Sequence, residues 1–213
     1  MEYIVEQVAP NEIEKRSFEM ITEELGDTPL IPGTESIVKR CIHTSADFEY
    51  AQNLVFSKDA LEKAKEALLN GAIILTDTNM GKAGINKDAL AKLGCTVDCY
   101  IATDEAKQMA LENGTTRAVA SVDLALKLNR PIIFAVGNAP TALLRILQLH
   151  KENKLNPSLV IGVPVGFVNV IQSKELLIQS NIPHIVARGR KGGSNIAACI
   201  INALTYELTN RKL

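Results

Sequence analysis

The segment Lys39–Phe48 (KRCIHTSADF) contains the side chain best suited to move a proton. The chain has three histidines, and His43 alone is followed by polar residues, Thr44, Ser45 and Asp47, that could orient an imidazole ring. An imidazole with an ordinary pKa of about 6.5 donates or accepts a proton near neutrality. We therefore predict that His43 is an acid–base residue, against the alternative of a histidine that only fills an apolar stretch.

The arginines suggest binding of carboxylates, because guanidinium groups hold carboxylates in bidentate geometry. Arg117 lies in the first turn of a predicted helix (TTRAVASVDLALKLN), where a cation opposes the helix dipole, so a functional role is favoured. Arg16 lies near the start of another predicted helix, and Arg188, Arg190 and Lys191 follow a predicted strand. Ordinary surface charge explains Arg190 and Lys191 equally well.

Metal and thiol chemistry have weaker support. The C-x3-C pair in CTVDCY has no His or Cys partner nearby, and no zinc-binding pattern occurs, so we predict no bound metal. We interpret the cysteines as free thiols rather than disulfides; they are Cys41, Cys95, Cys99 and Cys199.

Glycine-rich segments follow the predicted strands. Glycine lets the backbone approach a ligand and leaves amides free for anions, and ligands of parallel sheets collect beyond the carboxyl ends of the strands. We therefore predict a broad cleft that accepts anions. The loop residues expected to line it are Gly137, Asn138, Gly162, Gly192 and Gly193.

The elements that must position these residues alternate between strands and helices. Apolar runs without alternation indicate strands buried on both faces of a parallel sheet, and the helical patterns between them provide the cover. We predict an α/β fold, a three-layer sandwich with a central, mainly parallel sheet and helices on both faces. Residues 1–213 form one domain with an N-terminal helical segment, and no element is predicted between residues 26 and 56. The predicted strands are residues 71–78, 95–102, 131–138, 158–164 and 183–188.

The composition excludes several classes of protein. Hydrophobic residues make up 46%, charged residues 22%, and the net charge is -1. These values fit a folded chain without a dedicated nucleic-acid surface. No apolar run reaches the roughly 18 residues that span a bilayer, and the N-terminus carries acids where a secretory signal carries bases. We expect a cytoplasmic protein with no nucleic-acid or membrane partner.

Several segments together resemble one family, the precorrin-8X methylmutases, including their cobalt-precorrin-8 counterparts. The resemblance covers nearly the whole chain, and the order and spacing of the segments make it specific. They are RSF at residues 16–18, RCIHTSADF around His43, TDTNMGKAGI, TTRAVASVD, GNAPTALLRI, VIGVPVGFV and RGRKGGSNIAA.

This resemblance implies an enzyme of corrin (cobalamin) biosynthesis that moves a methyl group from C-11 to C-12 of a tetrapyrrole substrate. It implies hydrogenobyrinic acid or cobyrinic acid as the product, no dissociable cofactor, and a homodimer with sites near the subunit interface. The family's histidine falls on His43, its Arg-Ser pair on Arg16 and Ser17, and its helix arginine on Arg117. Ala46 stands where some relatives have glycine, and the segment after the histidine varies, so the resemblance does not fix the local shape of the pocket.

Two other functions stay open at the level of sequence. A nucleotide-binding Rossmann-type enzyme would use GRKGGS or NMGKAG, although both match the known phosphate-binding patterns only in part. A non-catalytic corrinoid-binding protein would use the same cleft without turnover.

Overall fold

A six-stranded sheet forms the centre of the computed structural model, which describes residues 5–209. The strand order is β1-β6-β5-β4-β2-β3, and all neighbours are parallel except β1, which pairs with β6 antiparallel at one edge. Every residue of β2, β4, β5 and β6 is buried, which explains their unbroken apolar character. The strands are β1 (Leu54–Phe56), β2 (Ile73–Thr76), β3 (Thr96–Asp98), β4 (Ile132–Val136), β5 (Leu159–Gly162) and β6 (His184–Ala187).

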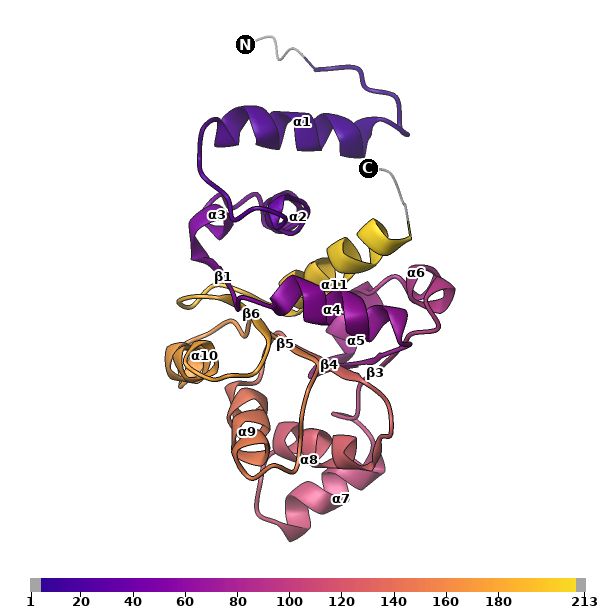
Figure 1. The fold of residues 1–213 in the computed structure, drawn as a ribbon, viewed down its shortest axis with the longest axis vertical. Coiled ribbons are helices and arrows are strands. Elements are labelled where there is room, and N and C mark those ends of the chain that lie inside the picture. The colour runs from indigo at the N-terminus through magenta and orange to yellow at the C-terminus, as the bar shows by residue number, and fades with distance from the viewer. Residues whose placement is uncertain (1–4, 210–213) are drawn as a thin grey trace.

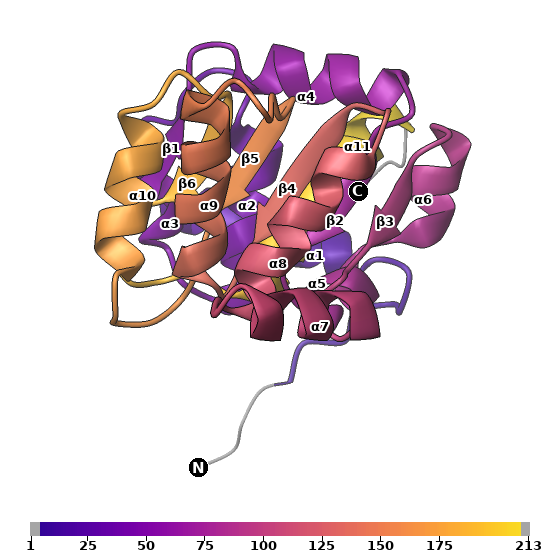
Figure 2. The ribbon, with the colours of Figure 1, turned by 90° about the horizontal axis from the view of Figure 1, so that it is seen from below.

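Helices cover both faces of the sheet, which confirms the predicted α/β sandwich (Figure 1). One face packs against α4 (Ala60–Leu69), α5 (Asn79–Gly84) and α11 (Ser194–Leu208). Figure 2 shows the helices of the other face side by side in front of the sheet; they are α8 (Arg117–Leu124), α9 (Pro140–Lys151) and α10 (Val170–Ile178). On this face, α7 (Asp104–Glu112) and a short 3-10 helix (Ala125–Lys127) adjoin α8, whereas α6 (Lys87–Lys92) packs against α11 on the first face.

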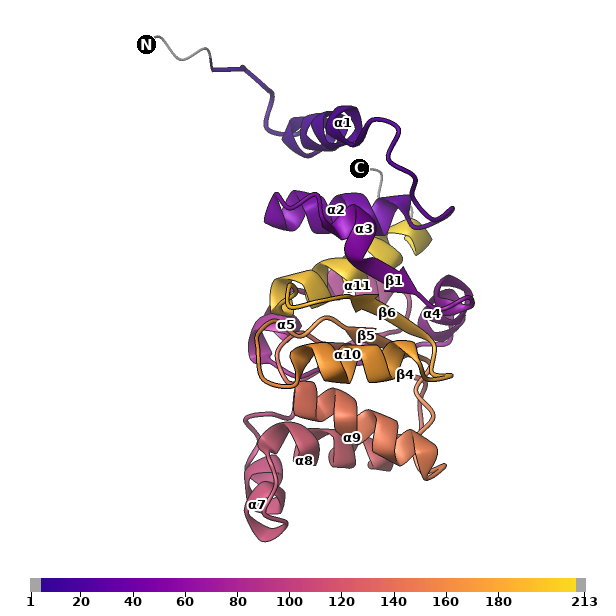
Figure 3. The same cartoon turned by 90° about the vertical axis from the view of Figure 1, so that its left-hand side faces the viewer.

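The N-terminal helices extend beyond this sandwich. α2 (Glu35–Ser45) packs across α11 on the side away from the sheet, and α1 (Ile13–Leu25) packs outside α2 (Figure 3). The short α3 (Tyr50–Asn53) leads into β1. The segment in which no element was predicted therefore holds α2, α3 and β1.

Within the described part of the chain, no helix combines the length and the apolar character that crossing a membrane requires.

Candidate functional site

The loops that follow β4, β5 and β6 are packed backbone against backbone. A Cβ added to Gly137 would lie 2.6 Å from Cα of Ser194, and one added to Gly192 would lie 2.1 Å from the carbonyl oxygen of Val163. The amide of Gly193 donates to that same carbonyl at 2.8 Å. The structure thus brings three of the predicted glycines together. Close backbone packing requires glycine at Gly137 and Gly192, and a φ of 130° favours it at Gly193.

Asp77, which follows β2, fills the turn at the start of α9. Its carboxylate accepts hydrogen bonds from the amides of Gly137 (2.8 Å), Asn138 (2.7 Å) and Ala139 (2.6 Å). Burial raises the pKa of this carboxyl group, and the hydrogen bonds donated by the three backbone amides oppose that rise. The expectation that this turn offers free amides is therefore corrected, because an anion of the chain itself occupies them.

Gly162 also lies in a different setting from the one predicted. It is the last residue of β5, paired with Val136 and Val186, and not part of the following loop. A Cβ at this position would lie 2.6 Å from Cδ2 of Leu177 on α10. Helix packing thus accounts for the glycine, and a contact with substrate stays a prediction.

The loop after β6 is tied to the residues that follow α2. The Lys191 ammonium lies 2.6 Å from the carboxylate of Asp47 and 3.0 Å from that of Glu49. The hydrogen bond from Lys191 lowers the pKa of Asp47. This tie places the end of the helix that carries His43 at the carboxyl edge of the parallel strands.

His43 lies in the last turn of α2 and is exposed to solvent. Its ring stacks on Phe18 of α1, with 5.4 Å between ring centroids and 29° between the planes. Within residues 5–209, no hydrogen bond engages either ring nitrogen. The ring is thus held on one face while its nitrogens remain open to a ligand.

The polar neighbours of His43 do not orient its ring, contrary to the sequence-based expectation. The hydroxyls of Thr44 and Ser45 donate to backbone carbonyls one turn earlier, at 2.8 and 2.7 Å, and the carboxylate of Asp47 binds Lys191. Adjacent residues on a helix point in different directions, and Ser and Thr readily bond the preceding turn. Stacking on Phe18 takes the orienting role.

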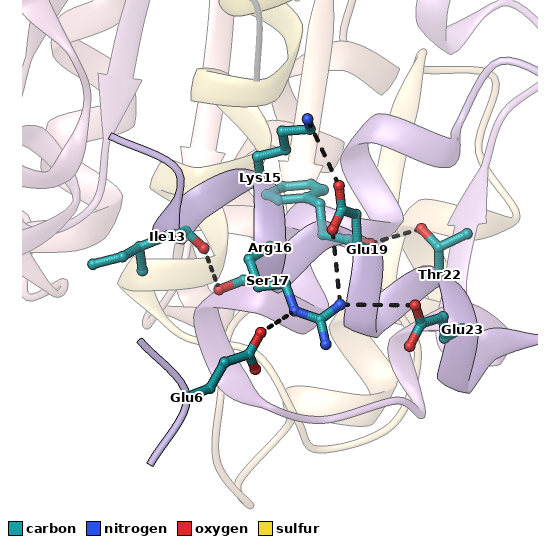
Figure 4. A network of polar contacts seen from close by, with 9 residues as sticks. Glu6, Ile13, Lys15, Arg16, Ser17, Glu19, Thr22 and Glu23 are labelled. Carbon is teal, nitrogen blue, oxygen red and sulfur yellow. Dashed lines mark hydrogen bonds and ion pairs between the residues drawn. The ribbon is translucent and has the colours of Figure 1, made fainter. Parts of the chain in front are cut away.

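Arg16 and Ser17 lie on α1 with their polar groups already bound (Figure 4). Arg16 Nε lies 2.8 Å from the carboxylate of Glu6, and Nη1 lies 3.7 Å from those of Glu19 and Glu23. The Ser17 hydroxyl donates to the carbonyl four residues earlier at 2.8 Å. A substrate carboxylate would therefore exchange with glutamates at Arg16.

Arg117 lies at the same edge but on the opposite side of the sheet from α2. It is the first residue of α8, after the capping residue Thr116, whose hydroxyl lies 3.2 Å from that of Thr141 near the start of α9. Its side chain is exposed and has no ion pair within the described residues. The structure thus leaves its guanidinium open but does not bring it into contact with His43.

An exposed apolar loop adjoins the cationic one. The side chains of Phe167 and Val168 are 79% and 80% exposed, and the Arg190 guanidinium lies 5.4 Å from the centroid of the Phe167 ring. The Gly166 amide donates to the Arg190 carbonyl at 3.2 Å, so the two loops are joined. This surface can contact an apolar ring system and a carboxylate together.

Two open grooves lie away from these loops. A groove of about 630 Å³ between α1 and α2 is lined by three glutamates and only two lysines, so it does not favour an anion. A groove of about 540 Å³ between α8 and α9, near Arg117, is lined by Thr115, Thr141 and Arg145, among others. Neither groove is the broad cleft at the glycine loops that the sequence predicted.

Sequence reasoning missed two buried charged residues, Asp77 and Lys174. Lys174 on α10 is fully buried, and its ammonium donates to the carbonyls of Gly189 (2.9 Å) and Lys191 (2.8 Å). Burial lowers its pKa to about 8. The sequence could have indicated Asp77, because its carboxylate comes directly after a buried strand. It could not have indicated Lys174, which stands among other polar residues of a helix.

Other chemistry finds little support among residues 5–209. No three His, Cys, Asp or Glu side chains gather there as a metal site. All four cysteines are buried free thiols, as predicted. The segment NMGKAG forms α5, and Lys82 within it pairs with Asp98 at 2.7 Å, so neither its backbone nor its lysine resembles a phosphate-binding loop.

Comparison with known proteins gives one consistent answer. The family model described as precorrin-8X methylmutase matches residues 12–207. A cobalt-precorrin-8 methylmutase of Salmonella typhimurium is 45% identical over 93% of this chain and 96% of its own length. The counterpart from Priestia megaterium is 43% identical over 93% of this chain and 88% of its own length.

A solved structure agrees with these relatives. The crystal structure of a precorrin-8X methylmutase from Thermus thermophilus superposes with a TM-score of 0.86 at 36% identity, covering 95% of this chain and 100% of the other. With matches of this extent in both sequence and fold, the chain belongs to the precorrin-8X methylmutase family of methyl-shifting isomerases.

Proposed function

We propose that this chain moves a methyl group from C-11 to C-12 of precorrin-8X or cobalt-precorrin-8, giving hydrogenobyrinic or cobyrinic acid. The observation that carries the proposal is His43, an exposed imidazole at the carboxyl edge of the sheet whose ring nitrogens form no hydrogen bond within residues 5–209. It stands near loops that offer apolar and cationic side chains to a large acidic ring system.

His43 is the proton donor in this proposal. A proton delivered to the macrocycle withdraws electrons from its conjugated system and lowers the barrier to methyl migration. A positioned general acid contributes about 10²–10⁴-fold to a rate. The ring of Phe18 holds one face of the imidazole, which fixes the direction of its nitrogens.

The arginines and loops bind the substrate in this proposal. Arg117 has an open guanidinium that suits a peripheral carboxylate, and Arg16 takes another in exchange for Glu6, with Ser17 beside it. Holding the ring in a shape close to that of migration supplies the rest of the acceleration. Among the glycines, Gly192 and Gly193 shape the loop that presents Arg190 to the substrate.

We also propose that the enzyme acts as a cytoplasmic homodimer. The outer side of α1 exposes Ile13 and Met20, each about half exposed, and a subunit contact would remove them from water. Sedimentation equilibrium of the active protein at micromolar concentration tests this, and a fully active monomer would refute it.

The decisive experiment incubates the purified protein with each substrate and follows the absorption spectrum. We expect wild type to produce the product spectrum and His43→Ala to turn over about 10²–10⁴-fold more slowly. His150→Asn is the matched control, because His150 bonds Leu155 and Asn181 and lies at the other end of the fold. Wild type inert toward both substrates would refute the proposed reaction, and full activity of His43→Ala would refute the role of the histidine.

The same experiment separates the enzyme from a non-catalytic corrinoid-binding protein. A carrier shifts the substrate spectrum on binding but never yields the product spectrum, and it treats His43→Ala as a change in affinity alone.

A further inference from the structure

Lys174 is a buried cation to which the proposed methyl shift assigns neither a chemical step nor a substrate contact. It lies in the middle of α10 with none of its surface exposed. A buried charge without a partner of opposite sign is costly, so its retention calls for a physical reason.

Its contacts lead to the loop after β6. The ammonium donates to the carbonyls of Gly189 and Lys191 at 2.9 and 2.8 Å, and the carbonyl between them, that of Arg190, accepts from Gly166 at 3.2 Å. Three successive carbonyls are thus bonded to the body of the protein. Positive φ angles at Gly189 (81°) and Gly192 (155°) permit this path.

The loop presents its charges at the edge of the sheet. Lys191 pairs with Asp47 and Glu49 just after the helix of His43, and Arg190 lies against the exposed ring of Phe167. The position of these side chains therefore depends on the backbone path that Lys174 holds.

We propose that the Lys174 ammonium is a positioning residue for substrate binding, which fixes the loop of residues 188–193 so that the Arg190 guanidinium faces a carboxylate of the substrate. The proposal rests on the proposed function and adds a residue that touches neither the substrate nor the reacting atoms.

Among residues 5–209, no carboxylate forms an ion pair with Lys174. Glu175, its neighbour on α10, pairs with Arg188 at 2.9 Å. The other titratable side chains on the elements packed against α10 are Arg145, His150 and Lys151 on α9 and His184 on β6. Burial is the sole cause that lowers the pKa of Lys174 to about 8, so its charge is present at neutral pH and is lost within one or two pH units above.

The first test compares wild type with Lys174→Met, which keeps an unbranched side chain one atom shorter and removes the donors and the charge. We expect KM for the substrate to rise at least about 10-fold with kcat changed less, because two hydrogen bonds from a charged donor are lost. Leu177→Ala on the same helix is the matched control for general destabilisation; Leu177 packs against the strand at Gly162. An unchanged KM in Lys174→Met overturns the proposal, as does an equal rise in the control.

Limited trypsin digestion provides a readout without substrate. Trypsin cuts after Arg188, Arg190 and Lys191, and we expect cleavage there at least about 10-fold faster in Lys174→Met than in wild type and in the control. Equal cleavage in all three overturns the proposal. This readout also separates the two hypotheses, since it decides the role of Lys174 even if wild type proves inert toward corrinoids.

Wild type alone decides the matter if Lys174→Met does not fold. A neutral amine still donates two hydrogen bonds, but bonds from a charged donor are about twice as strong. We therefore expect trypsin cleavage in the loop, normalised to an unstructured peptide, to rise at least about 3-fold between pH 7 and pH 9. A flat profile overturns the proposal.

Discussion

Replacement of Asp77 by asparagine changes a single atom in the turn that starts α9. In the wild type, one carboxylate oxygen accepts from Gly137 and the other accepts from both Asn138 and Ala139. An asparagine can offer its oxygen to the last two amides, but its NH2 group then faces the Gly137 amide. Two donors oppose each other, and a buried amide is left without an acceptor.

The expected loss follows from these contacts. A hydrogen bond to a charged group contributes about 1.5–3 kcal/mol, and an unpaired buried donor costs about 1–3 kcal/mol. Removal of the buried charge returns part of this, because burial raises the pKa of Asp77 and so disfavours its ionised form. We expect Asp77→Asn to lower the free energy of unfolding by about 2–4 kcal/mol.

Urea unfolding followed by circular dichroism measures this quantity. The matched control is Asp98→Asn at the end of β3, where the carboxylate is partly exposed and pairs with Lys82. We expect a change of about 1 kcal/mol or less there. If Asp77→Asn unfolds within 1 kcal/mol of wild type, or no more easily than the control, the turn does not depend on the carboxylate and our reasoning about it is wrong.

Two further predictions concern residues of the proposed site. Glu6→Gln removes the carboxylate that competes for Arg16, so we expect KM for the substrate to fall by up to about 5-fold in steady-state assays at low salt; an increase in KM would contradict exchange at Arg16. Gly162→Ala places a methyl group 2.6 Å from Leu177 Cδ2, and we expect urea unfolding to show a loss of about 1–3 kcal/mol. The loss in the Gly162→Ala/Leu177→Ala double variant should be smaller than the sum of the two single losses, and strict additivity would contradict the contact.

The sheet could be predicted from the sequence because its central strands are buried on both faces. Each apolar run from β2 to β6 contains one strand, although the strands are shorter than the runs. The edge strand β1 could not be predicted, since its three residues are defined as a strand only by their pairing with β6. The helix α2 was missed because its apolar stripe is short and is buried only by packing against α11. The stripe consists of Ile37, Val38, Cys41 and Ile42.

Residue type was enough to select the residues of the proposed site from the sequence, but it did not reveal their hydrogen-bond and ion-pair partners. Glycine and arginine in a sequence show what a loop can do, whereas the groups already bound there depend on distant residues. Asp77 stands 60 positions from Gly137, whose amide donates a hydrogen bond to its carboxylate, and Glu6 stands 10 positions from Arg16. Free amides at Gly137 and Asn138 were therefore a reasonable expectation that tertiary contacts overturned.

The charged residues divide into two groups by burial. The buried ones, Asp77 and Lys174, bond the backbone of the loops after β4 and β6 and so fix the loop paths. The exposed ones, including Arg117 on α8 and Arg190 in the loop after β6, keep their charge at the surface. Under the proposed function, loops with fixed paths would hold the reacting macrocycle in one shape. Substitution of a buried member should therefore alter substrate binding through the loop path, and substitution of an exposed one should alter it through charge alone.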